Sequence, residues 1–313
     1  MPQIAVIIPH YNDVARLLRC LGALAPQLGG EAPSEAPGTI EVAVVDNGST
    51  QPLDEVRAAV AALPGGRLIT ETLPGAAEAR NRGVAETTAP RLAFLDCDCV
   101  PSADWIATLR RIALAPGPGE PAASSALPDI LGGSIEVFDE TPPPRSGAEA
   151  FEAVFAFDNR GYVEKQGFSV TANLVTRRDV FERAGPLRAG VSEDLEWCRR
   201  AVATGFRLAY AAELRVTHPA RANWAALRRK WRRTTIEGFG TLAKAGSGVS
   251  AAARLRWALR GLAMLPSILV HAPRVMGHSE LSRGEKLRAI GTLARLRGQR
   301  CAWMLWQAAG GRI

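Results

Sequence analysis

Short apolar runs alternate with amphipathic segments over the first 115 residues of the chain. Four apolar runs are typical of buried strands, and they cover 4–8, 40–45, 68–70 and 92–95. Three segments repeat apolar residues every three or four positions, as helices do, and they cover 13–24, 53–63 and 76–85. Because each parallel neighbour in a sheet requires a crossover connection, this alternation predicts an α/β fold with a parallel sheet.

The pattern changes after residue 115. Proline and glycine gather in two stretches that we expect to form loops, 116–129 and 139–147. Further strands are predicted over 130–138, 169–177 and 206–219, the last as one strand or two. Further helices are predicted over 177–185 and, with Ser192 as the cap, over 192–205. These elements complete an α/β domain that we expect to span residues 1–220.

From residue 221 onward the pattern is helical and basic. Residues 223–240 and 285–310 have the spacing of amphipathic helices. The run 255–276 is apolar but contains Pro266, and it is too short and interrupted for the ~20 apolar residues of a membrane-spanning helix. We therefore expect a basic amphipathic helical tail over residues 221–313.

Charge separates the two predicted domains. The net charge of the chain is +7, but residues 221–313 hold 18 Lys plus Arg and only 3 acids, a balance of +15. The first 220 residues hold 20 bases and 28 acids, a balance of −8. Such asymmetry indicates that the tail meets an anionic surface, either membrane lipid or nucleic acid, or that it packs on the first domain or on a second subunit.

Location and partners follow from the same features. Arginines stand beside four tryptophans of the tail, Trp231, Trp257, Trp303 and Trp306, which favours an interfacial position over a membrane-spanning one. Nucleic acid is not the expected partner, although binding of nucleic acid by the tail stays an alternative. The first residues enter a strand with no basic region or cleavage site, so no signal peptide is expected. The five cysteines form no C-x-x-C pair or zinc spacing. We expect a cytoplasmic protein with peripheral contact to the inner face of the cell membrane.

Two carboxylates, Asp96 and Asp98, end the fourth predicted strand. Ligands of parallel sheets bind at the carboxyl ends of the strands, where the polar stretches 9–12 and 46–50 also lie. Paired carboxylates at such an edge can hold a hard divalent cation, which bridges readily to diphosphate. A turn with two solvated acids is the alternative for an isolated D-x-D.

An ordered set of motifs makes the sequence resemble glycosyltransferase family 2, whose members have the GT-A fold. The motifs are "VIIPHYN" (6–12), "VVDNGST" (44–50), "GAAEARNRGV" (75–84), "FLDCD" (94–98) and "SEDLEWCRRA" (192–201). The resemblance covers roughly residues 1–220. It implies a Rossmann-like nucleotide-diphospho-sugar transferase domain, followed here by the basic helical extension. It also implies transfer of a sugar, with inversion, from a nucleotide-diphosphate donor to a hydroxyl of a glycan or lipid-linked acceptor, as in polysaccharide or glycolipid biosynthesis.

The resemblance also implies residue roles. Metal ligation of Mn²⁺ or Mg²⁺ on the donor diphosphate falls on Asp98, less directly on Asp96, and on His218 in some relatives. The catalytic base falls on Asp194, the second acid of the Glu193–Asp194 pair. Donor contacts fall on Pro9, Tyr11, Asp46, Arg80, Asn81, Asp96 and Asn173. A helix cap at residues 192–194 and a structural histidine before Pro219 are the alternatives for two of these motifs.

Three rival interpretations use the same residues. A sugar-phosphate nucleotidyltransferase would need a Gly-rich loop after the first strand, whereas "PHYND" has no glycine. A processive synthase would carry Q-x-x-R-W, and "ALRRKWRR" lacks the glutamine. A catalytically degenerate GT-A module, which binds sugars or scaffolds partners, would be expected to lose acids that are intact in this sequence. This last interpretation stays open.

Overall fold

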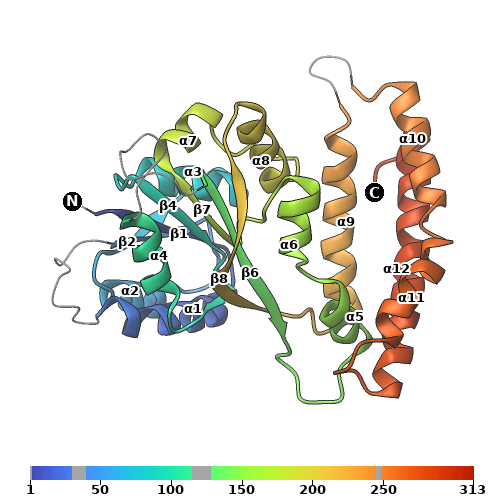
Figure 1. Cartoon of the computed structure of the whole chain (residues 1–313), viewed down its shortest axis with the longest axis horizontal. Helices are drawn as coiled ribbons and strands as arrows, with labels where there is room; N and C mark the ends of the chain where they lie inside the picture. The colour runs from blue at the N-terminus through green and yellow to red at the C-terminus, as the bar shows by residue number, and fades with distance from the viewer. Residues whose placement is uncertain (1, 30–39, 115–127, 244–247) are drawn as a thin grey trace. The chain divides into compact units, whose positions relative to one another are not determined.

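The computed structural model describes residues 2–29, 40–114, 128–243 and 248–313. It divides into two compact units (Figure 1). The first, here the sheet unit, comprises Met1–Glu136, Asp158–Ala189 and Glu193–His218; the second, here the helical unit, comprises Val137–Phe157, Gly190–Ser192 and Pro219–Ile313. The loop predicted over 116–129 lies almost entirely outside the described residues.

The sheet unit is built on eight strands in the order β3-β2-β1-β4-β7-β6-β8-β5. Their bounds are β1 Ile4–His10, β2 Ile40–Asp46, β3 Gly66–Thr70, β4 Arg91–Leu95, β5 Val100–Pro101, β6 Ile130–Phe138, β7 Asn173–Arg177 and β8 Leu208–Pro219. Strands β1 to β4 are parallel, as predicted, whereas β7 runs antiparallel to β4. The α/β prediction is confirmed, with a mixed sheet in place of a wholly parallel one.

Helices of the sheet unit follow the strands as crossovers (Figure 1). They are α1 Val14–Leu28, α2 Asp54–Ala61, α3 Ala76–Ala85, α4 Trp105–Leu114, α6 Asn159–Gly161, the π-helix η1 Tyr162–Gln166, α7 Arg178–Ala184 and α8 Glu193–Ala203. Helix α3 packs against β1 and β2. Gly83 permits this packing, because a Cβ there would lie 2.4 Å from Cγ2 of Ile7. The close approach fixes α3, and with it Arg80, above the strand ends.

Strand register decides which polar residues meet. His10 pairs with Asp46 at the end of β1 and β2, and Leu95 of β4 pairs with Asn173 of β7. Val100 of β5 pairs with Thr217 near the end of β8. Because that pair is antiparallel, the residues just before Val100 run alongside those just after Thr217. The register therefore brings the D-x-D segment beside the end of β8.

The helical unit consists of one helix from the middle of the chain and four from its end. They are α5 Gly147–Phe155, α9 Trp224–Gly240, α10 Ala251–Leu262, α11 Ser267–Met276 and α12 Arg283–Ala308. The helices α9 to α12 agree with the helical, basic pattern of the sequence. Helix α5 was not predicted, and it packs Phe151 against Leu227 and Leu293 in one core cluster. Removal of the C-terminal helices would therefore strip α5 of its partners.

The tryptophans of the helical unit differ from expectation. Trp257 and Trp303 are buried, and Trp231 is half-buried, so these three rings belong to the interior of the unit. The arginines beside them in space make cation–π contacts, with Arg300 4.4 Å from the centre of the Trp231 ring and Arg228 5.5 Å from that of Trp303. The pairing of Arg and Trp in the sequence therefore reflects packing within the unit, and the predicted interfacial place for these three tryptophans is wrong. Only Trp306 of the four is largely exposed.

A capping box starts α12 and makes the stability of the unit depend on pH. Ser282 donates from its backbone and hydroxyl to Glu285, and the Arg145 backbone N–H also donates to that carboxylate. These hydrogen bonds lower the pKa of Glu285 to about 2. Because the folded-state pKa lies below the unfolded one, the contribution is complete above pH 4.5 and disappears as the pH falls towards 2.

We expect Glu285→Gln to lower the free energy of unfolding by about 1 kcal/mol at pH 7, the typical worth of a helix cap. The difference from the unsubstituted protein should shrink as the pH falls from 4.5 towards 2. Urea unfolding followed by circular dichroism at several pH values measures it, with Glu280→Gln, an exposed acid of the same loop, as the control. A deficit that stays constant down to pH 2 would show that the carboxylate does not act through its charge.

Candidate active site

The carboxyl ends of β1, β2 and β4 gather most of the residues predicted from the motifs at one edge of the sheet. Asp46 ends β2 and is 4% exposed, whereas Tyr11, just after β1, is 61% exposed. Asp96 and Asp98 follow β4, and Glu193 and Asp194 open α8. The arrangement is a polar rim above a buried apolar sheet.

His10 holds Asp46 in place. The His10 Nδ1 lies 3.0 Å from Asp46 Oδ1, and the backbone N–H of Asp13 donates to His10 Nε2 over 3.2 Å. A backbone N–H can only donate, so Nε2 accepts and the proton of the neutral ring sits on Nδ1, from which it donates to Asp46. The Ser49 N–H donates to the other oxygen, Asp46 Oδ2, over 3.2 Å. Both carboxylate oxygens are thus oriented by the chain.

Two asparagines tie the loops of this edge together. Asn12 has φ +49°, a left-handed conformation that asparagine tolerates well, and its Oδ1 accepts from the backbone N–H groups of Thr50 and Gln51. The Asn47 Oδ1 accepts from the Gly75 N–H over 2.6 Å, at the start of α3. The "PHYN", "DNGST" and "GAAEARN" motifs are therefore physically joined.

Arg80 links the D-x-D motif to the start of α8. Its guanidinium donates through Nη2 to Asp96 and through Nη1 to Glu193 Oε1, the latter over 3.2 Å. Burial opposes the charge of Arg80, but the two carboxylates outweigh burial and raise the pKa of the guanidinium. Arg80 is therefore a cation between two anions, and in this structure its guanidinium pairs with carboxylates of the protein itself.

Asp98 pairs with His218 at the end of β8. The distance from Asp98 Oδ2 to His218 Nε2 is 3.1 Å, and His218 is buried. The carboxylate is about a quarter exposed. The two acids of the D-x-D motif thus have separate partners, Arg80 for Asp96 and His218 for Asp98, which explains how adjacent anions end one strand.

The cysteines that alternate with these acids carry protonated thiols. Burial, followed by the charges of Asp98 and Asp96, raises the pKa of both the Cys97 and the Cys99 thiol. Neither thiol is therefore an activated nucleophile.

Two predicted donor contacts belong to the fold instead. Asn173 is completely buried, its Oδ1 accepts from Trp105 Nε1, and its Nδ2 donates to the carbonyls of Ser134 and Leu214. The Asn81 side chain donates to the Leu187 carbonyl and accepts from the Leu187 N–H, both over 2.9 Å. The asparagines of the "TAN" strand and the "ARN" helix therefore form hydrogen bonds that join segments within the protein. Pro9 is likewise buried within β1.

Comparisons with known proteins agree with this edge. Residues 5–119 match the sequence profile of the family described as glycosyl transferase family 2. The chain is 29% identical over 236 residues to glycosyltransferase AglE of Haloferax volcanii, across 74% of this chain and 72% of the relative. Residues 5–119 therefore carry the sequence of a family 2 glycosyltransferase. A shorter match, 35% over 122 residues, joins it to validoxylamine A glucosyltransferase of Streptomyces hygroscopicus subsp. limoneus, across 38% of this chain and 26% of that protein.

Solved structures confirm the GT-A fold of the chain. The mannosyltransferase PcManGT from Pyrobaculum calidifontis, solved with GDP-Man and Mn²⁺, has a TM-score of 0.50 at 18% identity. The alignment covers 99% of this chain and 75% of the mannosyltransferase chain. S. aureus TarS 1–349 with UDP-GlcNAc has a TM-score of 0.51 at 14% identity, across 99% and 93%. At these identities the likeness establishes the fold.

The Asp98–His218 pair fits a divalent cation. The carboxylate oxygen and the imidazole nitrogen are both ligand types that divalent transition-metal cations accept, and they lie 3.1 Å apart. In the part of the chain that the structure describes, no group of three or more His, Cys, Asp or Glu side chains is gathered to hold a metal ion. A cation here would therefore draw most of its ligands from the donor and from water, as Mg²⁺-type sites do.

His10 is the residue of this family 2 site that the motifs did not reveal. It stands inside the quoted "PHYN", but its role depends on the β1–β2 register that sets it opposite Asp46. A buried histidine next to a strand-end aspartate was the available signal. His10 positions Asp46 and does not itself face a substrate, since it is 1% exposed.

We expect His10→Phe to weaken binding of the nucleoside diphosphate about tenfold, because Asp46 would lose one hydrogen bond and part of its orientation. His10→Asn, which keeps a donor at short range, should weaken binding less. Isothermal titration with the nucleoside diphosphate measures both. Equal losses for the two variants would indicate disturbed packing at β1 in place of a lost donor.

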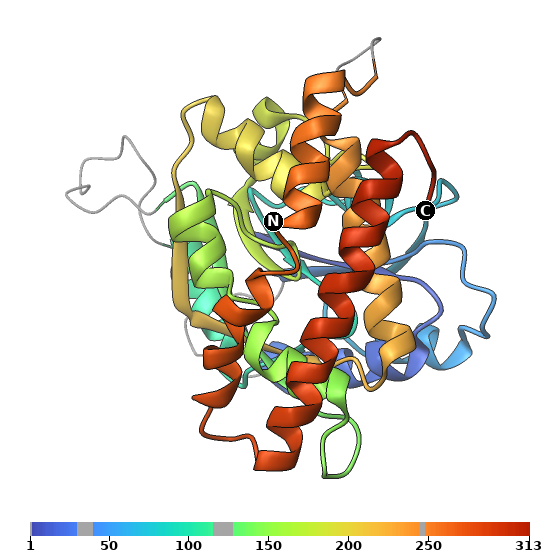
Figure 2. The same cartoon turned by 90° about the vertical axis from the view of Figure 1, so that its right-hand side faces the viewer.

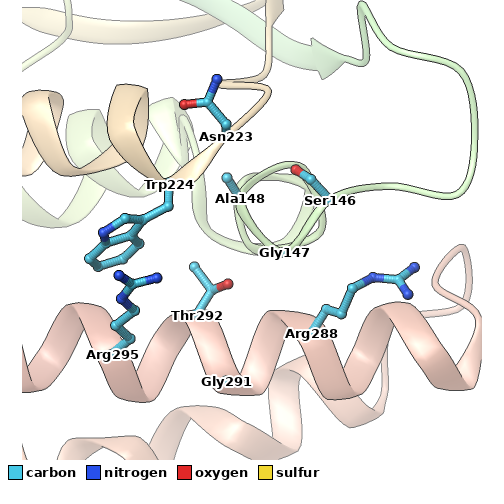
Figure 3. Close-up of a pocket in the computed structure, with 9 residues that line it drawn as sticks. All are labelled: Ser146, Gly147, Ala148, Asn223, Trp224, Arg288, Gly291, Thr292 and Arg295. Atoms are coloured by element: carbon cyan, nitrogen blue, oxygen red, sulfur yellow. The ribbon is translucent and has the colours of Figure 1, made fainter.

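A separate pocket of about 370 Å³ lies within the helical unit, between the starts of α5 and α9 and the middle of α12 (Figure 3). Arg295 stacks 4.1 Å from the centre of the Trp224 ring, whereas Arg288 donates to the Arg145 carbonyl. Figure 3 shows these two arginines directed to opposite sides, with Thr292 between them. Polar groups do not converge on one point here, as they do in an active site.

None of the helices within residues 2–29, 40–114, 128–243 and 248–313 combines the length and hydropathy that crossing a membrane requires.

Proposed function

We propose that this family 2 enzyme transfers a sugar from a nucleotide-diphosphate donor to a hydroxyl acceptor, with inversion at the anomeric carbon and with the help of Mn²⁺ or Mg²⁺. One observation carries the proposal. Arg80 joins Asp96 to Glu193, and Asp98, from the same D-x-D motif, pairs with His218. The carboxylate proposed for the cation, Asp98, and the carboxylate proposed for the acceptor, Asp194, thus come from segments 96 positions apart.

On the donor side, Asp46 accepts a hydrogen bond from the base, since its two oxygens are each oriented but keep lone pairs. Tyr11 is exposed beside it and offers a flat apolar ring to the base, with the buried backbone of Pro9 behind. GDP-Man and UDP-GlcNAc in the structural neighbours support a nucleotide sugar as the donor class.

Around the diphosphate, Asp98 and His218 would hold the cation, and Asp96 would act through Arg80. A bound divalent cation supplies charge that stabilises the leaving nucleoside diphosphate. Arg80 holds the Asp96 carboxylate in place, and it adds a positive potential behind the rim. The Mn²⁺ in the mannosyltransferase neighbour supports the choice of metal.

On the acceptor side, Asp194 is the base. The Glu193 carboxylate is held by the Arg80 guanidinium, so it is the less available of the two acids. Asp194 accepts from the Leu195 N–H over 2.8 Å, which orients one oxygen at the start of α8. Removal of the hydroxyl proton on the side opposite the leaving group gives a single displacement and therefore inversion.

The acceptor is a glycan or a lipid-linked sugar, as in polysaccharide or glycolipid biosynthesis. In this proposal residues 1–220 perform the transfer, and residues 221–313, with their charge of +15, keep the enzyme at the inner face of the cell membrane, where such acceptors are presented. The absence of a spanning helix from the described ranges is consistent with peripheral contact.

A thermal-shift panel tests the proposal. Nucleotide-diphosphate sugars should raise the melting temperature with Mn²⁺ or Mg²⁺ present and much less without, since bound ligand stabilises by mass action. The matching nucleoside monophosphate, which lacks the diphosphate, is the control. If the donor raises the melting temperature equally with and without the cation, donor binding does not depend on the metal and that part of the proposal is wrong. Donor binding without turnover on any acceptor is the result expected of a sugar-binding module.

A further inference from the structure

Large apolar side chains are exposed together on α10 and α11. Leu255, Leu259, Leu262, Leu265, Leu269, Val270 and Met276, here the apolar face, are between 47% and 78% exposed. Half of the exposed large hydrophobic residues of the described chain lie in this stretch of 22 residues, so they are not the scattered singles of an ordinary surface.

Helix α10 is apolar on two opposite sides. Ala253, Trp257 and Gly261 form its buried stripe, while Leu255 and Leu259 lie about half a turn away on the solvent side. The helix cannot rotate to bury these leucines, because Trp257 donates to Gln307 of α12 over 3.0 Å, and a Cβ on Gly261 would lie 3.0 Å from the Cβ of Met304. The fold therefore presents the leucines to something outside the chain.

Helix α11 continues the apolar face. Val275 is fully buried in a core cluster of the unit, while Leu269, Val270 and Met276 are exposed. The two helices have 12 and 10 residues, or about 18 and 15 Å, against a hydrocarbon core of about 30 Å. They are too short to cross a bilayer, and their length suits helices that lie on one.

The charge around the apolar face has one sign. From residue 251 to residue 277 the sequence has four arginines and no Asp or Glu. Arg256, Arg260 and Arg274 are exposed, and none of them has a carboxylate partner in the described part of the chain. Arg260 and Arg274 lie over the rings of Trp257 and Phe155, which leaves their charge without an anion. An apolar strip bordered by such guanidinium groups is complementary to a surface with an apolar interior and anionic phosphates.

We infer that α10 and α11 dock the protein on a membrane that contains anionic lipid, with the apolar face among the acyl chains and the three arginines at the phosphates. Figure 2 looks onto α10, α11 and α12 of the helical unit. The inference rests on the proposed function and deepens it, because it names the residues that hold the enzyme at the membrane. The inserted residues are leucines, in place of the tryptophans, which are buried. A second copy of this chain would cover the apolar strip but would leave the arginines without anions.

Vesicle flotation of the full chain, without donor or metal, tests the inference. We expect binding to vesicles of phosphatidylcholine mixed with phosphatidylglycerol and little binding to phosphatidylcholine alone. Leu259→Glu with Leu269→Glu should lower binding at least about tenfold for each side chain that no longer inserts. Arg256→Gln, Arg260→Gln and Arg274→Gln together should remove the preference for anionic vesicles. Val202→Glu, an exposed apolar position on α8, is the matched control and should bind as the unsubstituted protein does.

Three results would overturn the inference. They are absence of binding to either vesicle, equal binding by the double glutamate variant, and a dimer in ultracentrifugation that the double variant dissociates. The last would assign the apolar face to a second copy. Because the leucines are exposed, circular dichroism should show that the variant stays folded. Donor-induced thermal shifts, measured without vesicles, should be the same in the double variant as in the unsubstituted protein. If the unsubstituted protein binds anionic vesicles but shows no donor-induced shift, the proposed function is contradicted and the inference is not.

Discussion

Asp194→Asn should lower kcat by about 10²–10⁴-fold, the usual worth of a general base, while donor binding stays unchanged. Asparagine has almost the same shape and can still accept from the Leu195 N–H, so α8 keeps its first turn. It cannot take a proton from an acceptor hydroxyl. Initial rates with a saturating donor measure the loss, and a donor-induced thermal shift measures binding in the same preparation.

Glu193→Gln is the matched control for Asp194→Asn. It removes one of the two anions that hold Arg80, so its main effect should be a lower melting temperature with only a modest fall in kcat. A large loss of kcat in Glu193→Gln, together with normal turnover in Asp194→Asn, would exchange the two roles. The contrast is informative because the two acids are adjacent and Glu193 is the one that forms an ion pair with Arg80 in this structure.

The sequence was sufficient for the elements that depend on local pattern. Strands β1, β2 and β4 are apolar runs buried on both faces, and α3 lies at the predicted Ala76–Ala85. The edge at which Asp46 and Asp96 meet followed from the rule that parallel strands share their carboxyl ends. Periodicity and strand order are encoded within a few tens of residues, which is why they could be derived.

Features that depend on pairing between distant segments could not be derived. Asn173 looks polar and available in "TAN", yet the mixed part of the sheet surrounds it with β6, β8 and Trp105. Arg80 was expected to face the diphosphate, but α8 delivers Glu193 to it from 113 positions away. A helix at α5 was missed because its partners lie in α9 and α12, beyond residue 223. In each case the deciding neighbour comes from another part of the chain.

The separate partners of Asp96 and Asp98 predict opposite consequences for two substitutions one residue apart. Asp98→Asn should abolish the cation-dependent part of the donor-induced thermal shift and lower kcat/KM by about 10²-fold or more, since the cation would lose its protein carboxylate. Without metal its melting temperature should stay near that of the unsubstituted protein, because an amide can still hydrogen-bond to His218. Asp104→Asn, at an exposed acid that pairs with Arg215, is the control for charge alone.

Asp96→Asn should behave in the reverse way. It leaves Arg80 buried with one anion in place of two, which should cost about 3 kcal/mol of folding stability in the absence of any ligand. The cation-dependent shift should persist in this variant, since Asp98 and His218 are untouched. Differential scanning fluorimetry of both variants, with and without Mn²⁺ and donor, makes the comparison in one experiment. If Asp96→Asn loses the metal effect while Asp98→Asn keeps it, the cation binds to the first acid of the motif, and the pairing of Asp96 with Arg80 must rearrange when donor binds.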